Sequence, residues 1–265
     1  MIYRALADLE TQNKPGVLCT IVSTTGSTPR HSTSKMLVYA DGAIVGTVGG
    51  GEIENRVIAA AQQAFLDGKP RLLHYNMADP QRGDPGVCGG QVDIFVEPIL
   101  PKPTVVVIGA GHVGKAVAQL AHWLGFRVAV SDDRPQFCTP EAVPGADDYY
   151  PLPMEKLPQS LEIGPWTFFV LTTRGMDVDV AGLPVILDTP AGFIGVIGSK
   201  RRWAETCKAL VTAGVSAEKL SRVHSPIGLE LKAETPEEIA VSILAQIIML
   251  RNGGDGSVMA DSSRP

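Results

Sequence analysis

The sequence has little of what several protein classes require. Only four of its 265 residues are cysteine, and none forms a C-x-x-C pair, which argues against a structural zinc site or a disulfide scaffold and favours a reducing compartment. No uncharged apolar stretch reaches the ~20 residues of a membrane span. The first ten residues carry early charges without a long apolar core, so they do not predict a signal peptide. We therefore expect a soluble, cytoplasmic protein with no membrane partner.

Strong charge and several familiar catalytic motifs are also absent. The formal net charge is -5, so there is no electrostatic case for nucleic acid or an anionic membrane as a partner. No H-E-x-x-H, G-x-S-x-G or P-loop sequence occurs, which argues against a zinc protease, an α/β-hydrolase and a P-loop NTPase. Four histidines have no metal-ligand spacing: His31, His74, His112 and His122.

The most informative segment that is present runs from Thr104 to Gly114. A short β-branched apolar run meets three glycines at the spacing of a dinucleotide-binding turn. Gly109 would allow the tight turn, Gly111 the approach of a pyrophosphate, and Gly114 the close packing of helix on strand. A second apolar run ends at Asp132, close to where an acidic residue bonds a ribose. This predicts a Rossmann-type nucleotide site; a fold that has outlived its ligand is the alternative.

A proline-rich segment divides the chain. Three of the six residues from Pro98 to Pro103 are proline, which stiffens the backbone and is typical of a linker. The fold class is α/β, an N-terminal α+β domain followed by a Rossmann-like domain with a doubly wound parallel sheet. The predicted divisions are a first domain at 1–98, a linker at 99–103, a second domain with a C-terminal helix at 104–251, and a disordered tail at 252–265.

Hydrophobic periodicity predicts the elements of each domain. In the first, a hairpin is expected at Asp41-Gly42, and a helix ends before Gly68. In the second, apolar runs alternate with helix-length patterns. The predicted elements of the first domain are strands at 17–22, 36–39, 43–45, 72–75 and 92–96 and a helix at 52–67. The predicted strands of the second are 104–108, 127–131, 167–172, 193–197 and 221–224.

The last helix has a clear start signal and a wide apolar surface. Thr235 supplies a capping hydroxyl, Pro236 suits the first turn, and Glu238 completes a capping box. Ala240, Val241 and other apolar residues widen its stripe beyond one covering face. A homodimer interface is one use for this surplus, and a deeply buried helix is the other.

Glycine-rich segments give the first domain the chemistry of a cofactor site. Gly26-Ser-Thr-Pro-Arg30 offers amides, hydroxyls and a guanidinium fork, or it is a plain turn with a solvated arginine. Three glycines before Glu52 can form an anion-binding nest, or they only give the helix start its flexibility. Cys88 is an exposed nucleophile or soft-metal ligand, or a small buried hydrophobe, whereas Cys19 lies in an apolar strand. The candidate cofactor-binding residues are Arg30, Gly49, Gly50, Gly51, Glu52, Cys88, Gly89 and Gly90.

Two further segments follow strands of the second domain. Gly195 to Arg202 combines a glycine turn with three basic residues, which is typical of a second phosphate contact or of a solvated helix start. His224 follows the last strand and either lines the same crevice or caps a turn. The candidate nucleotide-binding residues are Gly109, Gly111, His112, Gly114, Asp132, Arg174, Ser199, Lys200 and Arg201.

Together these motifs resemble the XdhC/CoxI family of xanthine dehydrogenase accessory factors. The resemblance runs in order over about residues 10–250 and covers both domains. Its segments are Gly26-Ser-Thr-Pro-Arg30, Gly49-Gly-Gly-Glu-Ile-Glu54, Cys88-Gly-Gly90, Gly109-Ala-Gly111, Asp132-Asp-Arg-Pro135, Thr173-Arg-Gly175, Ile197-Gly-Ser-Lys-Arg201, His224-Ser-Pro-Ile-Gly-Leu229 and Thr235-Pro-Glu-Glu-Ile-Ala240. One departure is Met176, where family members commonly have histidine; it leaves Arg174, Asp177 and Asp179 as polar candidates.

The resemblance implies a cytoplasmic chaperone, often a homodimer, that has no turnover of its own. It would bind the molybdenum cofactor (molybdopterin), support its sulfuration by a cysteine desulfurase, and help insert it into an apo molybdenum hydroxylase. The chain itself is not that hydroxylase, because it lacks the iron–sulfur cysteines and the length for flavin and molybdopterin domains. In the physical version of this hypothesis, Gly49–Gly51 hold the cofactor phosphate and Cys88 lies near the molybdenum or the incoming sulfur.

Two alternatives stay open. One is an NAD(P)-dependent oxidoreductase with Asp132 on the adenosine ribose, although the sequence offers no convincing acid/base residue for it. The other is a non-catalytic nucleotide or redox sensor that signals through its dimer interface.

Overall fold

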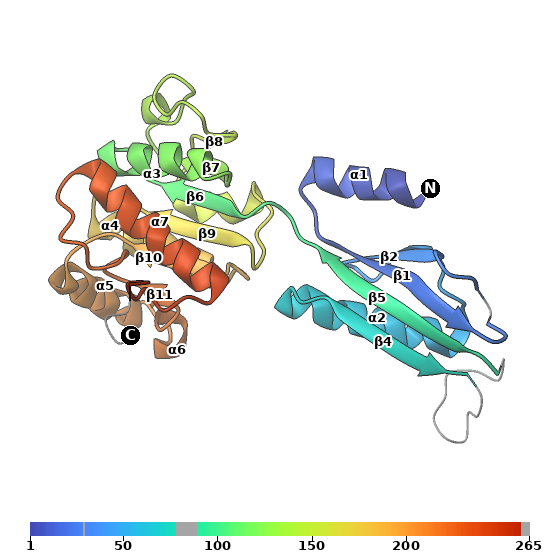
Figure 1. Ribbon diagram of the computed structural model, residues 1–265. Coiled ribbons are helices and arrows are strands. Elements are labelled where there is room, and N and C mark those ends of the chain that lie inside the picture. Colours follow the sequence, from blue (N-terminus) through green and yellow to red (C-terminus); the bar gives the residue numbers. More distant parts are fainter. Residues whose placement is uncertain (29, 78–88, 261–265) are drawn as a thin grey trace. The chain divides into compact units, whose positions relative to one another are not determined.

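The structure is a computed structural model that describes residues 1–28, 30–77 and 89–260. The chain forms two compact units, Met1–Pro101 (unit 1) and Lys102–Pro265 (unit 2), shown in Figure 1. The division falls inside the proline-rich segment, although the last strand of unit 1 already extends to Ile99. Among the described residues, no helix combines the length and the apolar character that a bilayer crossing requires.

The described residues of unit 1 form a five-stranded antiparallel sheet and two helices. The strand order is β3-β2-β1-β5-β4, and every neighbouring pair is antiparallel. The hairpin expected at Asp41-Gly42 is confirmed, because the Tyr39 amide donates to the Ala43 carbonyl across it (2.9 Å). The elements are α1 (Ile2–Gln12), β1 (Gly16–Thr25), β2 (Lys35–Tyr39), β3 (Ile44–Gly46), α2 (Gly51–Asp67), β4 (Arg71–Asn76) and β5 (Gln91–Ile99).

The core of unit 1 lies between α2 and one face of the sheet. Alternate residues of β1, among them Val17 and Cys19, are buried against Val57 and Ala61 of α2. This is the pattern of a half-buried strand against an amphipathic helix. Cys19 is fully buried, and burial raises the pKa of its thiol to about 12. The expectation that Cys19 is a structural residue is therefore confirmed.

Unit 2 is a six-stranded parallel sheet with helices on both faces. The strand order is β11-β10-β9-β6-β7-β8. Along the chain, β7 and β8 are added on one side of β6, and β9, β10 and β11 are then added on its other side. The predicted doubly wound Rossmann-type fold is therefore confirmed. Its elements are β6 (Thr104–Ile108), α3 (His112–Trp123), β7 (Arg127–Ser131), η2 (Pro135–Phe137), β8 (Asp148–Tyr150), η3 (Met154–Gln159), β9 (Thr167–Leu171), α4 (Met176–Leu187), β10 (Phe193–Val196), α5 (Lys200–Thr212), α6 (Ala217–Leu220), β11 (Val223–His224) and α7 (Pro236–Asn252).

The central strand β6 is buried on both faces. Val105 and Val107 belong to the core beneath α3 and α7, whereas Val106 and Ile108 belong to the core beneath α4 and η3. A parallel strand covered on both sides is expected to be apolar throughout. This is why the run at 104–108 is continuous rather than alternating, and it fixes the carboxyl end of β6 as a rigid platform.

Helix α7 begins with the predicted capping box. Thr235 accepts a hydrogen bond from the Glu238 amide, and the Glu238 carboxylate accepts one from the Thr235 amide. Its buried side chains pack with α3, while Val241 and Leu250 remain exposed. Packing inside unit 2 therefore accounts for most of the apolar stripe, and a homodimer stays a prediction.

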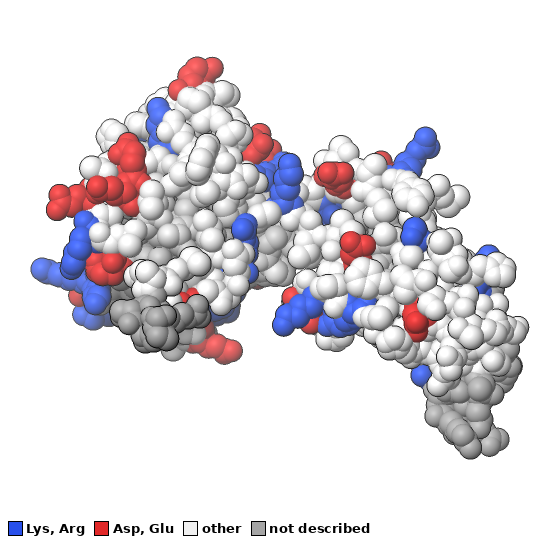
Figure 2. All heavy atoms as spheres, viewed as in Figure 1, with Lys and Arg blue, Asp and Glu red and all other residues white. Residues whose placement is uncertain are grey.

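The charged side chains are mixed in sign over the surface shown in Figure 2. Acidic and basic residues are interspersed on this face of both units, in keeping with the small net charge of -5. This face therefore does not concentrate one sign of potential.

Candidate functional site

The loop between β6 and α3 is the predicted glycine turn. Gly109 has φ of +98°, and a Cβ there would lie 2.6 Å from the carbonyl oxygen of Thr172. A Cβ on Gly114 would overlap the carbonyl oxygen of Gly109, so packing requires both glycines. At Gly111, φ is -72°, and apart from its neighbours along the chain no atom of the described residues lies within 4 Å of an added Cβ. The open space beside Gly111 therefore serves no packing purpose, and a pyrophosphate needs such space.

The start of α3 points free amides toward this space. Gly111 is the N-cap residue, and within the described chain no side chain caps it. His112, the first helical residue, is exposed. The first turn of a 12-residue helix has unpaired N–H groups and the positive end of the helix dipole, which together favour an anion.

Asp132 directly follows β7, but the protein itself occupies its carboxylate. Oδ2 accepts from the Ala110 amide (2.8 Å) and from Nη2 of Arg134 (2.9 Å). Oδ1 accepts from the amide (3.0 Å) and Nε (2.9 Å) of Arg134. Burial disfavours its ionised form, yet these bonds hold the pKa of Asp132 below its ordinary range. The observed contacts of Asp132 tie the glycine turn to β7.

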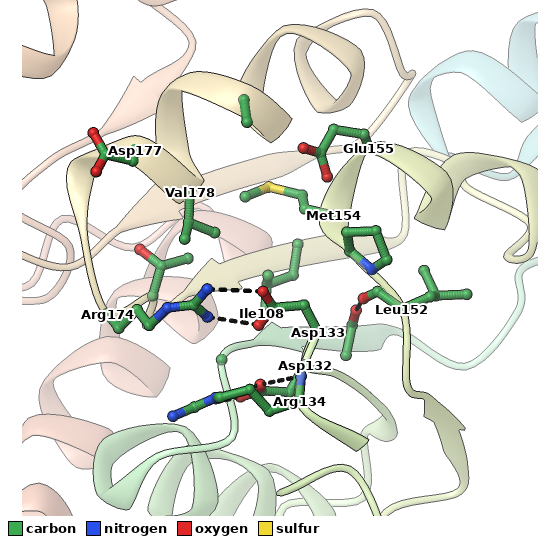
Figure 3. Close-up of a pocket in the computed structure, with 15 residues that line it drawn as sticks. Ile108, Asp132, Asp133, Arg134, Leu152, Met154, Glu155, Arg174, Asp177 and Val178 are labelled. Atoms are coloured by element: carbon green, nitrogen blue, oxygen red, sulfur yellow. Dashed lines mark hydrogen bonds and ion pairs between the residues drawn. The ribbon is translucent and has the colours of Figure 1, made fainter. Parts of the chain in front are cut away.

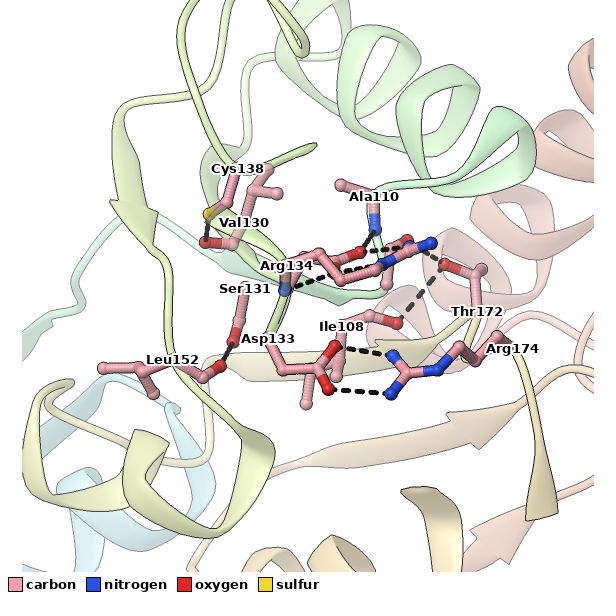
Figure 4. A network of polar contacts seen from close by, with 12 residues as sticks. Ile108, Ala110, Val130, Ser131, Asp133, Arg134, Cys138, Leu152, Thr172 and Arg174 are labelled. Atoms are coloured by element: carbon pink, nitrogen blue, oxygen red, sulfur yellow. Dashed lines mark hydrogen bonds and ion pairs between the residues drawn. The ribbon is translucent and has the colours of Figure 1, made fainter. Parts of the chain in front are cut away.

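The neighbouring residue, Asp133, forms an ion pair across the end of β6. Nη1 and Nη2 of Arg174 donate to its two carboxylate oxygens at 2.6 and 2.8 Å (Figure 4). Asp133 follows β7 and Arg174 follows β9, and β6 lies between these strands. The two side chains are 33% and 51% exposed, so solvent weakens the pair and it can open at little cost.

A pocket of about 230 Å³ lies beside this pair (Figure 3). Its apolar lining comes from Leu152, Pro153 and Met154 and from Val178 and Ala181 of α4. The pocket lies at the carboxyl ends of β6, β7 and β9, where the strand order reverses. Open α/β sheets bind their ligands at this position.

The predicted nucleotide-binding residues divide into two groups. Gly109, Asp132 and Arg174 line the pocket, with Gly111, His112 and Gly114 in the adjoining turn. The basic segment does not line it: Ser199 caps α5 by accepting from the Arg202 amide, and Lys200 and Arg201 are exposed. His224 is also outside the lining; it stacks on Phe193 with 4.8 Å between ring centroids, and burial lowers its pKa.

A buried polar cluster behind the pocket was not expected from the sequence. Asp179 of α4 is 0% exposed; it accepts from the Thr173 hydroxyl (2.5 Å) and from Nη2 of Arg202 (2.6 Å). The same Nη2 also donates to the Thr173 hydroxyl (3.0 Å). The cluster fixes the segment that carries Arg174. In the sequence, the only signal was the departure at Met176. It made Asp179 a polar candidate but did not indicate which residues bind it.

Unit 1 brings two of its predicted glycine segments together. β1 ends at Thr25, which pairs with Gln91 at the start of β5. A Cβ on Gly90 would overlap the carbonyl oxygen of Ser27, so the loop after β1 packs tightly on the segment before β5. Gly26 has φ of +74° and a Cβ there would lie 3.1 Å from Cα of Gly90. These backbone contacts require glycine on both sides.

The third glycine segment lies at the same end of the sheet. The Thr47 amide, just after β3, donates to the carbonyl oxygen of Lys35 at the start of β2 (3.0 Å), and β2 is antiparallel to β1. Gly50 and Gly51 have φ of +78° and +62°, and no described atom lies within 4 Å of a Cβ added at either. Bare backbone beside open space is what an anion-binding nest presents.

Glu54 occupies part of this nest. Its Oε1 accepts from the amides of Gly50 (2.9 Å) and Val48 (3.2 Å) and from the Thr47 hydroxyl. Partial burial disfavours its ionised form, but these bonds hold the pKa of Glu54 below its ordinary value. Glu52, which was predicted to bind the cofactor, pairs with Arg56 at 3.0 Å on the surface. In the sequence, the only feature that could have pointed to Glu54 is its position four residues after Gly50.

The remaining candidates of unit 1 are less constrained. Arg30 is exposed, and its carbonyl accepts from the Thr28 hydroxyl (2.8 Å). Gly89 precedes Gly90 and has φ of +79°. Cys88 lies outside the described residues. Within the described residues, no group of three or more His, Cys, Asp or Glu side chains has the arrangement of a metal site.

We expect Glu54→Gln to loosen the nest in a pH-dependent way. The folded pKa lies below the ordinary value of 4.5, so the carboxylate stabilises the loop above that pH and loses this effect as pH falls through the folded value. Hydrogen exchange of residues 47–54 should therefore be faster in the variant at pH 7, and the difference from wild type should shrink below pH 4.5. Comparing both proteins at the same pH cancels the intrinsic rate.

The matched control is Glu52→Gln, which removes an exposed carboxylate from the same helix turn. It should leave exchange in this segment nearly unchanged, because an exposed ion pair contributes only about 0–1 kcal/mol. Equal exchange in wild type and Glu54→Gln at pH 7 would show that Glu54 does not hold the nest.

Comparison with known proteins gives matches to both units. Residues 9–76 match the XdhC and CoxI family, and residues 105–247 match the XdhC Rossmann domain. The chain is 38% identical over 268 residues to the uncharacterized protein YqeB of Escherichia coli (strain K12), covering 100% of this chain and 49% of YqeB. It is 22% identical over 280 residues to the molybdenum cofactor insertion chaperone PaoD of the same organism, covering 94% of this chain and 88% of PaoD.

Two further matches are shorter or more distant. A probable xanthine dehydrogenase subunit of Bacillus subtilis (strain 168) is 33% identical over 159 residues, which are 60% of this chain and 46% of that protein. The chain thus spans about half the length of YqeB and of the Bacillus subtilis protein. A crystal structure described as a xanthine dehydrogenase from Bacillus halodurans has a TM-score of 0.51 at 23% identity, covering 99% of this chain and 97% of that one. This last likeness concerns the fold alone.

Proposed function

Because the chain belongs to the XdhC and CoxI family, we propose that it is an accessory factor for a molybdenum hydroxylase. It binds the molybdenum cofactor as cargo, aids its sulfuration by a cysteine desulfurase, and helps insert it into the apoenzyme. The observation that carries the proposal is the family match in both units, supported by the likeness to a molybdenum cofactor insertion chaperone over 94% of the chain.

The residues of unit 1 fit a phosphate-bearing cargo. Gly50 and Gly51 leave open space beside backbone that only glycine adopts readily. The amide of Gly50 already holds a carboxylate oxygen of Glu54, so it is directed at an anion. A cargo phosphate would take the place of that carboxylate, and exposed Arg30 would add a positive charge. The exchange of one anion for another keeps the nest satisfied whether loaded or empty.

Cys88 is the proposed contact to the metal end of the cargo. It directly precedes Gly89, whose neighbour Gly90 packs against the loop that leads to Arg30. A thiolate is a soft ligand suited to a transition metal. The cofactor supplies the redox-active molybdenum, and the chain supplies the anion nest, the guanidinium and the thiolate that hold it.

We expect Cys88→Ser to reduce activation of the partner hydroxylase at least about tenfold, since a lost metal contact of 1.4 kcal/mol is already a factor of 10. The measurement is hydroxylase activity after maturation with each variant, together with the circular dichroism spectrum of the variant. Cys207→Ser is the matched control, because Cys207 lies on α5 of unit 2. Normal activation by Cys88→Ser would remove this thiol from the proposal, and normal activation without the chain would remove the accessory role.

A further inference from the structure

The pocket of unit 2 has room for one part of a ligand and apolar walls to hold it. Pockets that enclose a whole drug-sized molecule have about 300–1,000 Å³, and this one has about 230 Å³. Its lining includes the apolar residues Leu152, Pro153, Met154, Val178 and Ala181. An apolar lining of this kind suits a heterocycle whose faces lose water on binding.

The space outside the pocket suits a diphosphate. Gly109 belongs both to the pocket lining and to the glycine turn, so the two are continuous. Beyond it lie the open space at Gly111 and the uncapped first turn of α3. A ligand with its base in the pocket would therefore direct its phosphates to these amides.

The carboxylate available to a ribose is that of Asp133 and not that of Asp132. A carboxylate has about four lone-pair sites, and four protein hydrogen bonds already reach Asp132. Each oxygen of Asp133 receives one bond, from Arg174, which leaves acceptor capacity on both. Asp133 also lines the pocket and is 33% exposed, against 2% for the Asp132 side chain.

We propose that this pocket binds the base and ribose of a nucleoside diphosphate, with Asp133 accepting hydrogen bonds from free ribose hydroxyls. The Asp133–Arg174 pair is part of the pocket lining (Figure 3). Glu155 and Asp177 also line it, so its acidic groups outnumber its two arginines. A ligand carrying a 2′-phosphate would bring a further negative charge to these carboxylates, and like charges in contact oppose binding. The inference concerns unit 2 alone and does not rest on the accessory role.

The test is isothermal titration calorimetry of the full chain with ADP-ribose, NAD, NADP and inorganic pyrophosphate. We expect micromolar binding of ADP-ribose and NAD, at least about tenfold weaker binding of NADP, and weaker binding still of pyrophosphate. A CDP titration distinguishes a pyrimidine from a purine ligand; binding of either nucleotide class supports the proposal.

Asp133→Asn separates recognition from a merely structural role. It should weaken ADP-ribose binding by about tenfold, because a hydroxyl binds a charged acceptor more strongly than a neutral amide, and it should narrow the ratio of NAD to NADP affinity. Asp188→Asn, which breaks an exposed pair with Lys219 outside the pocket, should change neither. The proposal is overturned if neither purine nor pyrimidine nucleotides bind the folded chain, if NAD binds and NADP binds as tightly, or if Asp133→Asn leaves nucleotide affinity unchanged. The accessory role would survive each of these results, since it is measured by hydroxylase maturation.

Discussion

Replacing Gly114 with alanine is expected to lower the free energy of unfolding of unit 2 by about 3 kcal/mol, the upper range for overpacking. The added Cβ would overlap the carbonyl oxygen of Gly109 and lie 2.7 Å from the Thr172 hydroxyl. The first of these is backbone within a turn that Asp132 ties to β7, so it cannot move aside as a flexible side chain would.

The matched variant is Gly111→Ala, three residues earlier in the same turn. Its φ of -72° suits alanine, and the added Cβ meets no described atom within 4 Å. Its stability should therefore stay within about 0.5 kcal/mol of wild type, while ADP-ribose binding is lost because the methyl group fills the space for the diphosphate.

Urea unfolding followed by tryptophan fluorescence measures this directly, because all three tryptophans lie in unit 2: Trp123, Trp166 and Trp203. Equal midpoints for Gly114→Ala and Gly111→Ala would contradict the packing argument. Full ligand binding by Gly111→Ala would show that the open space serves no diphosphate.

Asp179→Asn is expected to destabilise unit 2 by about 3 kcal/mol, the lower end of the range for breaking a buried ion pair. Asp179 is completely buried, and Arg202 is 27% exposed, so water can partly compensate the cation. Nε of Arg202 already lacks a hydrogen-bond partner among the described residues, which leaves little alternative bonding inside the cluster. The segment that carries Arg174 should loosen as well.

The same fluorescence experiment checks this prediction, with Asp188→Asn as the control. Asp188 pairs with Lys219 on the surface at 60% exposure, and exposed pairs contribute about 0–1 kcal/mol. A midpoint for Asp179→Asn close to that of the control would mean that the cluster is not a structural support of the pocket.

The central strands of unit 2 could be predicted because they are buried on both faces. The run at 104–108 and the core of 127–131 are apolar, and the structure has both strands at these bounds. β8 was not predicted: its three residues, Asp148 to Tyr150, are only partly buried and form an edge strand without a periodic pattern. α1 was likewise missed, because only two of its residues, Ala5 and Leu9, are buried and two positions make a weak periodic signal.

The candidate site was predictable in position and less so in detail. The glycine spacing located the turn and predicted the roles of its glycines: a Cβ on Gly109 or Gly114 would meet backbone atoms, whereas open space lies beside Gly111. The sequence cannot tell that hydrogen bonds from Ala110 and Arg134 already occupy the Asp132 carboxylate, and this is why we propose Asp133 for the ribose contact. The role of Glu54 was missed for the same reason, because its carboxylate is also held by backbone amides. Hydrogen-bond saturation is a property of neighbours in space, and a single sequence does not show it.

The central claim is that the chain carries the molybdenum cofactor. The most direct test is to produce the full chain in a host that makes the cofactor and to measure its molybdenum and pterin content. We expect that both co-purify with the chain in equal amounts and that Arg30→Ala lowers the two together. A folded chain that carries neither, and that takes up neither when mixed with released cofactor, would contradict the claim.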